Sequence, residues 1–500
     1  MNFIALLVGL LVFYIVFRYK RRRLYQLASR IPEPPDINSF LGLLQFSFDA
    51  QNVMMRVITD YTPFCHMNGG HAKLWLGPKL YIYMTNLEDS QFVLKNCLEK
   101  DEIMLMIEPC LGKATVIAPV PIWEKRRKAT VSAFTPKNIN NFVNTVSKQS
   151  LRIVEQMSSA NFAGTGVFSL WPYINRYSLK SSAEAIFGVE IENAKRPLEV
   201  YLEAITVGFQ LCTYRMMHFW LWPDFIYNLT SQGKIFYDYV DIAHETIDEI
   251  IAQTRANLEK KERNNNNSID QATKIQPSSF LEHLLLLDNN VLSSKDIREE
   301  TLVLLIAATD SSAIAICNTL LLLAKYPKIQ EKVYDEIKAA FGDSDRLLNT
   351  DDLHKITYLG AVLKESLRLF PPVPMVARKP DSEIKLPSGI ILPPETGVLV
   401  SIYGINRDPA SWGPDADCFI PERHLEDTEN GPTTIPFSAG PRNCLGYQYA
   451  LMSVKISLIA ILRRFKIVGE EESDPAPTME CDFTLMMKAK DGYRVALEYR

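Results

Sequence analysis

The chain has 500 residues, of which 47% are hydrophobic, 22% charged and 10% aromatic, and its formal net charge at pH 7 is −4. This composition belongs to a globular chain with a large apolar core, and it excludes a disordered protein, a collagen-like repeat and a multi-span transporter. The slightly acidic balance gives no reason to expect a nucleic-acid partner. Eight cysteines without a CxxC pair disfavour a zinc ribbon or a dense disulfide framework and favour a reduced, cytosol-facing compartment.

The N-terminus departs from this average. Residues 3–17 form an unbroken apolar run, and Arg18, Lys20 and three arginines at 21–23 follow it. Fifteen helical residues span only about 22 Å of a hydrocarbon core of about 30 Å, and snorkelling by the flanking basic residues absorbs such a difference. A cleaved secretory signal is the alternative, but the charges follow the run and no small-residue cleavage site adjoins it. We predict a retained transmembrane anchor over residues 1–18, with the body of the protein in the cytosol.

The rest of the chain predicts one linker and one large domain. Residues 19–40 are basic and proline-rich, as in a stiff linker. Residues 72–86 predict two short strands, and further strands are expected near 380–405 and after 480. Helical periodicity dominates elsewhere, apart from a solvated loop expected at 255–279. We therefore predict a mainly α catalytic domain with small β-sheets over residues 41–500.

Several catalytic motifs are missing from the sequence. It contains no Walker A loop, no GxGxxG after a strand and no GxSxG elbow. His244-Glu245 lacks the second histidine of a zinc protease motif. Hydrolases and nucleotide-dependent enzymes are therefore disfavoured.

Cys444 is the cysteine whose surroundings indicate chemistry. A lone cysteine is usually a small buried hydrophobe. Cys444, however, lies in the loop FSAGPRNCLG, which ends where a helical apolar pattern begins. Backbone N–H groups and a helix N-terminus there would lower the thiol pKa. Gly440 and Gly446 would let the backbone approach a flat ligand, and Arg442 would place a cation beside an anionic group of that ligand.

This loop resembles the haem-binding motif of cytochromes P450, FxxGxRxCxG, with every specified position present. The resemblance implies that Cys444 is the thiolate ligand of the iron of haem b, with Phe437, Gly440, Arg442 and Gly446 in the cofactor site. It also implies the cytochrome P450 fold and a haem-thiolate monooxygenase. Such an enzyme inserts one atom of O2 into a lipophilic substrate, which here could be fatty-acid-like, a hormone, a pheromone or a xenobiotic.

A Glu–Arg–Arg cluster extends the resemblance. Glu365 and Arg368 form an ExxR pair whose i, i+3 spacing favours an ion pair on one helix face. With Arg423 they resemble the structural cluster that supports the haem pocket of the family. At position 424, where phenylalanine is common in the family, this chain has histidine. We expect this difference to affect the packing around the cluster and not the cluster itself.

Trp123 and Arg127 match the WxxxR motif of the family. Indole and guanidinium N–H groups are donors suited to the haem propionates. Arg442 and Arg378 are further candidate propionate partners. An ordinary core aromatic is the alternative for Trp123.

The region 293–325 predicts one long helix whose apolar centre is interrupted by TDSS. Buried carboxyl and hydroxyl groups are costly unless hydrogen-bonded or hydrated, so they form either a satisfied polar patch or a proton relay beside a ligand. The stretch resembles the (A/G)GxDTT motif of the family, with Ala308 for Gly and Ser311 for Thr. Serine keeps the hydroxyl but loses the β-branch that fixes its rotamer. By resemblance Asp310, Ser311 and Ser312 are catalytic, and the first two deliver protons to iron-bound dioxygen with some leakage to peroxide.

Within the family, the stretches KESLRLFPPVPMVAR, NRDPASW and PFSAGPRNCLGYQYA are similar to the family 4 clan, including arthropod members. Many of its enzymes carry a glutamate that can esterify the haem where this chain has Ala307, so we expect haem that is not covalently linked. The resemblance implies an endoplasmic reticulum location and electrons from NADPH through NADPH–cytochrome P450 reductase, with cytochrome b5 as a further candidate partner. A docking face for the acidic reductase, or simply a solvated surface, is expected at Lys125, Arg126, Lys128, Arg463 and Arg464.

Two rivals to the monooxygenase remain open. One is a haem-thiolate isomerase or dehydratase without external electrons, against which Asp310 and Ser311 argue. The other is a non-catalytic haem-binding or ligand-binding protein. Apolar candidates for the substrate pocket, which could equally be core, are Met104, Met106, Ile117, Phe209, Leu211, Val373, Val376 and Leu485.

Overall fold

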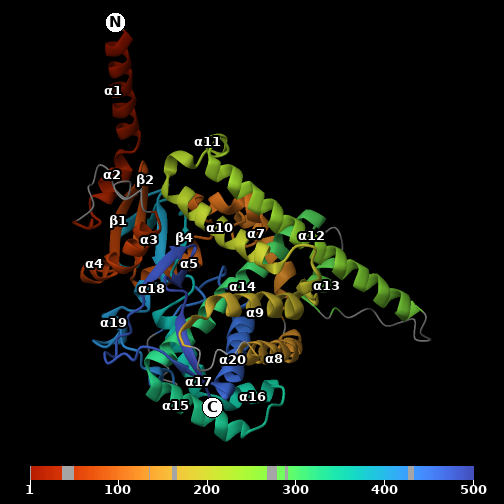
Figure 1. The fold of residues 1–500 in the computed structure, drawn as a ribbon. Coiled ribbons are helices and arrows are strands. Elements are labelled where there is room, and N and C mark those ends of the chain that lie inside the picture. Colours follow the sequence, from red (N-terminus) through yellow and green to blue (C-terminus); the bar gives the residue numbers. More distant parts are fainter. Residues whose placement is uncertain are drawn as a thin grey trace.

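A computed structural model describes residues 2–35, 50–134, 136–159, 166–266, 277, 279–287, 291–425 and 433–500. They form a mainly helical body with small sheets, as predicted, and α1 projects from it (Figure 1). The core helices are α8 (Pro136–Ser159), α9 (Trp171–Ser182), α10 (Leu198–Met217), α12 (Ser231–Asn266), α14 (Ser294–Lys325), α17 (Tyr358–Leu369) and α20 (Tyr447–Arg464). Around them lie α3 (Ala50–Thr59), α4 (Tyr61–Met67), α5 (Leu87–Asn96), α6 (Glu108–Leu111), α7 (Val120–Val131), α11 (Asp224–Tyr227), α13 (Phe280–Leu286), α15 (Pro327–Phe341), α16 (Thr350–Lys355), α18 (Ile402–Ile405) and α19 (Pro409–Trp412).

The predicted long helix is α14, and it runs through the centre of the body. Ser293 caps its N-terminus in a capping box with Asp296. The helix packs against α9, α12, α17 and α20. By length and composition it could cross a membrane, but 78% of its apolar stretch is buried inside the protein. Its hydrophobicity is therefore that of a core helix.

A four-stranded sheet stands beside the helices. Its strand order is β1 (His71–Leu76), β2 (Lys79–Met84), β7 (Gly397–Ser401) and β4 (Met375–Arg378), and the pairing of β2 with β7 is parallel. The predicted strands within 72–86, near 380–405 and after 480 are thus confirmed. The smaller sheets pair β9 (Cys481–Thr484) with β10 (Met486–Ala489), β5 (Ile384–Lys385) with β6 (Ile391–Leu392), and β11 (Arg494–Tyr499) with both β3 (Phe168–Ser169) and β8 (Phe465–Val468).

The N-terminal helices differ from the predicted boundaries. Helix α1 (Asn2–Lys20) contains the apolar run and continues past residue 18. The large apolar side chains of residues 4–16 are exposed, from 46% at Val16 to 70% at Ile4. Residues of the expected linker are helical in α2 (Arg22–Ala28), because Leu24 and Ala28 are buried against Leu80 of β2. The guanidinium of Arg21 donates to Pro78 O over 2.6 Å, so this basic segment is tied to the body.

The loop expected at 255–279 is helical in its first half. Helix α12 continues to Asn266, because the Glu, Lys and Arg residues of this segment are good helix formers with a solvated face. Residues 267–276 lie outside the described residues.

Candidate active site

Most of the predicted site residues line one cavity of about 360 Å³. Its walls come from α14, α7, the segment through β4 and the loop before α20. Cys444, Trp123 and Ser311 all border it. The remaining wall is mostly apolar and includes Val116, Phe134, Ile186, Phe280, Val303, Leu304, Ala307, Val373, Val376, Phe437, Leu451 and Met486.

The Cys444 loop is fixed by backbone and side-chain bonds. Cys444 N–H donates to Phe437 O over 3.0 Å. The Arg127 guanidinium donates to Asn443 O over 3.1 Å and to Asn443 Oδ1 over 2.8 Å. Helix α7 therefore holds the residue that precedes Cys444, and Arg127 serves the loop as well as the cavity wall.

The pKa of the Cys444 thiol differs from the expectation. Burial raises this pKa, although the Gly446 N–H and the Arg127 charge act in the opposite direction. The loop alone therefore does not lower the pKa below its ordinary value, because desolvation of the thiolate is the larger effect. A coordinated metal ion removes a thiol proton by its own charge, so this does not argue against ligation.

The two loop glycines have different surroundings. Gly446 lines the cavity, and nothing lies within 4 Å of where its Cβ would stand. Gly440 is not among the lining residues. Its φ is +73°, and a Cβ there would lie 2.4 Å from Leu94 O at the end of α5. The expectation that Gly440 lets the backbone approach the ligand is therefore corrected, because the close neighbour is α5.

Cationic side chains gather at one edge of the cavity. Lys100, Arg378 and Arg442 all line it. Arg378 is fully buried, and its Nε and Nη2 have no hydrogen-bond partner among the described residues; the same holds for Nε and Nη1 of Arg442. Burial lowers the pKa of both guanidinium groups to about 10. Burial and the two arginines also lower the pKa of Lys100.

Buried guanidinium N–H groups without acceptors are costly, and an anionic ligand would satisfy them. The two propionates of haem fit this requirement in charge and in number of acceptors. Trp123 belongs to the same edge, because the Arg442 guanidinium lies 4.6 Å from its ring centre. The residues present thus fit haem. Lys100 was missed from the sequence, where it stands in no motif.

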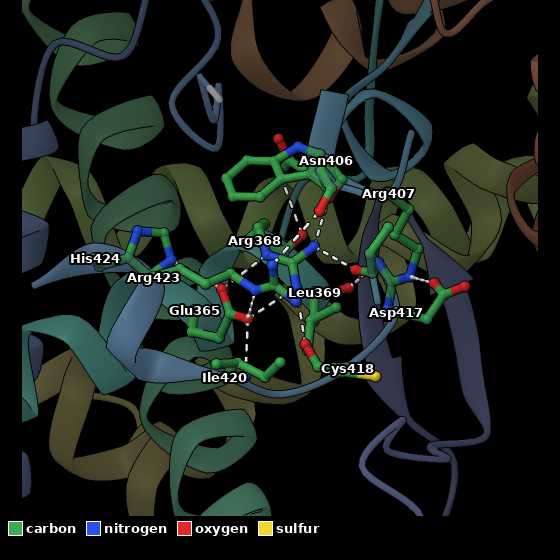
Figure 2. Close-up of polar contacts among 12 residues, drawn as sticks. Glu365, Arg368, Leu369, Asn406, Arg407, Asp417, Cys418, Ile420, Arg423 and His424 are labelled. Carbon is green, nitrogen blue, oxygen red and sulfur yellow. Dashed lines mark hydrogen bonds and ion pairs between the residues drawn. The ribbon is translucent and has the colours of Figure 1, made fainter. Parts of the chain in front are cut away.

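The predicted Glu–Arg–Arg cluster forms, and Figure 2 shows it with its backbone partners. The carboxylate of Glu365 accepts two bonds from the Arg368 guanidinium, over 2.7 and 2.8 Å. Arg423 Nε lies 3.6 Å from Glu365 Oε1. Arg368 also donates to three backbone carbonyls, those of Asn406, Ala416 and Cys418. The cluster therefore ties α17 to the segment that leads toward the Cys444 loop.

His424 is a fourth member of this cluster. Its Nε2 lies 2.8 Å from Glu365 Oε2, and Ile420 N–H donates to Glu365 Oε1 over 3.0 Å (Figure 2). Burial raises the pKa of Glu365, but bonds from Arg368 and His424 outweigh it and lower the pKa to about 2. Histidine at position 424, in place of the phenylalanine common in the family, thus adds a polar contact to the Glu365 carboxylate.

The structure separates the three predicted catalytic residues. Ser311 and Ser312 line the cavity, and Ser311 Oγ donates to Ala307 O over 2.6 Å. Ser312 Oγ is buried with no hydrogen-bond partner among the described residues. Asp310 is not a lining residue; its Oδ2 lies 2.7 Å from Lys488 Nζ of β10. Its proton-delivery role stays a prediction.

Some of the weaker expectations fail. Arg126 is buried, and it pairs with Asp296, Glu299 and Glu300, so it cannot belong to a docking face. Val373 and Val376 line the cavity as expected, but Leu485 does not, and Met486 takes its place. The other apolar candidates, Met104, Met106, Ile117, Phe209 and Leu211, do not line it either and belong to the hydrophobic core.

Comparisons with known proteins agree with this site. A family model described as Cytochrome P450 matches residues 32–495. The chain is 28% identical to cytochrome P450 4c3 of Drosophila melanogaster, with 99% of this chain and 94% of that protein covered. It is 29% identical to cytochrome P450 4V2 of Homo sapiens, with 90% and 86% covered, and 27% identical to cytochrome P450 4d1 of Drosophila melanogaster, with 97% and 96% covered. The predicted likeness to family 4, arthropod members included, is thereby confirmed. The chain belongs to the cytochrome P450 family and is a P450 monooxygenase.

Proposed function

We propose that this monooxygenase oxidises a lipophilic substrate in the cavity beside α14. Its electrons would come from NADPH through NADPH–cytochrome P450 reductase, and cytochrome b5 is a further candidate donor. The observation that carries the proposal is the composition of one cavity. Cys444, the Ser311 face of α14, and two guanidinium groups with N–H groups that lack acceptors among the described residues border the same, otherwise mostly apolar, space.

Different residues of the chain would hold the iron, the propionates and the ring of haem b. Cys444 supplies the iron ligand, while Trp123, Arg127, Arg378, Arg442 and Lys100 would hold the propionates. Phe437 and Gly446 would pack against the ring, and Glu365, Arg368 and Arg423 keep the supporting segment in place. When bound, the haem supplies O2 binding, and thiolate donation favours O–O cleavage.

Two features of this cavity govern the reaction. Its apolar wall favours lipophilic substrates and excludes water from the reacting atoms. Ser311 offers a hydroxyl on that wall that can hold and pass a proton at Oγ, with Ser312 beside it and Asp310 as the acid behind it. The ligation, the propionate contacts and the proton roles are all parts of the proposal.

We also propose that the protein is anchored in the endoplasmic reticulum membrane by α1, with its catalytic domain in the cytosol. The exposed apolar surface of α1 supports this location. Helix α11 lies at the same end of the body as α1 (Figure 1). Nearby Trp220, Phe225 and Leu229 are 43%, 72% and 81% exposed. These side chains suit a membrane interface, and this would let lipophilic substrates enter from the bilayer.

Reconstitution with purified reductase tests the electron source. We expect NADPH consumption that lipophilic compounds stimulate, with one hydroxylated product per NADPH in coupled turnover. Conversion without NADPH would instead indicate an isomerase or dehydratase, and ligand binding without turnover would indicate a binding protein.

The docking of the reductase is tested by salt. Lys125, Lys128, Arg463 and Arg464 are the remaining candidates for a basic docking face. Turnover should then fall as ionic strength rises, because salt screens exposed charges over about 10 Å at 0.1 M. Turnover that ignores ionic strength would contradict electrostatic docking.

A further inference from the structure

The predicted proton donor Asp310 has an ion-pair partner that no motif indicates. Lys488 Nζ lies 2.7 Å from Asp310 Oδ2, and the two side chains are 15% and 3% exposed. Asp310 comes from the middle of α14, whereas Lys488 comes from β10, 178 positions further along the chain. The contact therefore depends on how the β9–β10 hairpin packs on α14.

The hairpin aims Lys488 at this carboxylate. Residues 486 and 488 lie on the same face of β10, because side chains of a strand alternate. Met486 lines the cavity, so the same face of the strand reaches both the substrate space and Asp310. Lys488 Nζ also lies 4.4 Å from the ring centre of Trp171, which fixes the ammonium group between an aromatic face and the carboxylate.

The surroundings of Asp310 are buried and contain hydroxyl groups. Burial raises the pKa of Tyr201 and of Tyr493, and the charge of nearby Asp310 adds to both shifts. The hydroxyls of Tyr201, Tyr493, Thr309 and Ser312 have no hydrogen-bond partner among the described residues. Such a group of buried polar atoms suits bound water.

A carboxylate in this setting needs a counter-charge. A buried charge is costly unless it is paired, and Lys488 supplies the pairing for Asp310. Asp310 does not line the cavity, but its chain neighbour Ser311 does. The lysine thus decides the direction in which the Asp310 carboxyl group rests.

We infer that Lys488 is a positioning residue for proton delivery, whose ion pair orients the Asp310 carboxyl group between one delivery and the next. This inference rests on the proposed roles of Asp310 and Ser311. In each delivery step Asp310, once protonated from solvent, would pass that proton to Ser311 Oγ, and Ser311 would release its own hydroxyl proton into the cavity that it lines. The Asp310 carboxylate would then return to its ion pair with Lys488, and a solvent proton supplied as hydronium would reprotonate it at the start of the next delivery. No electron moves in this step, because NADPH supplies both electrons of the overall reaction.

The test compares Lys488→Met with the wild type in reconstituted, haem-loaded enzyme. We expect product formed per NADPH to fall severalfold and hydrogen peroxide to rise in its place. Turnover driven by added hydrogen peroxide should stay near the wild-type rate, because peroxide brings its own protons and electrons. Lys488→Arg should restore most of the coupling. The matched control is Lys490→Met, since Lys490 pairs with half-exposed Asp482 over 3.6 Å in the same hairpin.

Thermal unfolding gives a readout that does not depend on turnover. Asp310→Asn and Lys488→Met should each lower Tm, and the double variant should lose less than the two single losses together, because the pair is then removed as a unit. Coupling equal to the wild type in Lys488→Met, or additive losses of Tm, would overturn the inference. A wild-type protein that consumes no NADPH with reductase would instead refute the proposed function. The Tm values of the single and double variants would still show whether Asp310 and Lys488 interact. If Lys488→Met fails to bind haem, Lys488→Gln replaces it in both measurements.

Discussion

At the scale of single residues, the Glu–Arg–Arg cluster is built around one buried carboxylate, that of Glu365. Glu365 and Arg368 are both fully buried, and Arg368 is bonded to three backbone carbonyls besides. Breaking a buried pair by removing one partner leaves an uncompensated charge and costs about 3–5 kcal/mol. These residues therefore act on stability and on haem retention rather than on chemistry.

The pKa of Glu365 makes stability depend on pH. This pKa is about 2 in the folded protein, against 4.5 for an unperturbed glutamate. The stabilisation is therefore fully present above about pH 4.5 and is lost as the pH falls toward 2; integrated over that range it amounts to about 3 kcal/mol. Between pH 5 and pH 4 the Tm of Glu365→Gln should fall less than that of the wild type. Equal falls would contradict the assignment.

His424 should stabilise the same carboxylate. We expect His424→Phe to lower the free energy of unfolding by about 2 kcal/mol at pH 7, because a hydrogen bond to a buried charge is lost. Denaturant unfolding measures this, with exposed His354→Phe as the control. An unchanged midpoint in His424→Phe would show that Arg368 and Arg423 suffice.

Ser311 should determine how much of the consumed NADPH yields product and how much yields peroxide. Ser311 lines the cavity, so Ser311→Ala removes the proposed proton carrier while leaving the wall apolar. Product per NADPH should fall severalfold and peroxide should rise. Ser311→Thr, which restores the β-branch, should couple at least as well as the wild type. Unchanged coupling in Ser311→Ala would remove the proposed role.

At the scale of elements, α14 brings the oxygen motif to the cavity, with alanine and not glutamate at position 307. Ala307 lines the cavity where many family 4 enzymes are expected to carry glutamate. We expect acidified organic solvent to extract all of the haem from the denatured chain. Haem that stays with the polypeptide after this treatment would contradict a non-covalent cofactor.

The sequence was informative about elements with strong periodicity and about motifs with local geometry. Helix α14 and the β1–β2 hairpin were predictable because apolar spacing and turn residues are local signals. The Cys444 loop and the Glu365–Arg368 pair were predictable because fixed spacing encodes them. Contacts between segments that are distant in the sequence were not predictable. Lys488 and His424 gain their partners through packing, which also brings Lys100 to the cavity wall. Arg126 stands in a basic stretch, yet it is buried and pairs with three carboxylates of α14.

At the scale of the whole molecule, α1 should be separable from the catalytic body. Helix α2 packs on the body through Leu24 and Ala28, so the boundary for a truncation lies near residue 20. A chain without residues 1–20 should keep its haem and its Tm within a few degrees, while its partition into membranes in a flotation assay falls. Loss of fold in this variant would show that α1 is part of the body; unchanged flotation would assign the membrane contact to other surfaces such as that of α11.

The account rests on Cys444 as the iron ligand. The most direct measurement is the carbon monoxide difference spectrum of the reduced, haem-loaded chain, taken beside Cys444→Ser. Thiolate ligation predicts a strongly red-shifted Soret band in the wild type that is absent from the variant. An unshifted band in a folded, haem-replete wild-type protein would contradict thiolate ligation and, with it, the proposed chemistry of the cavity.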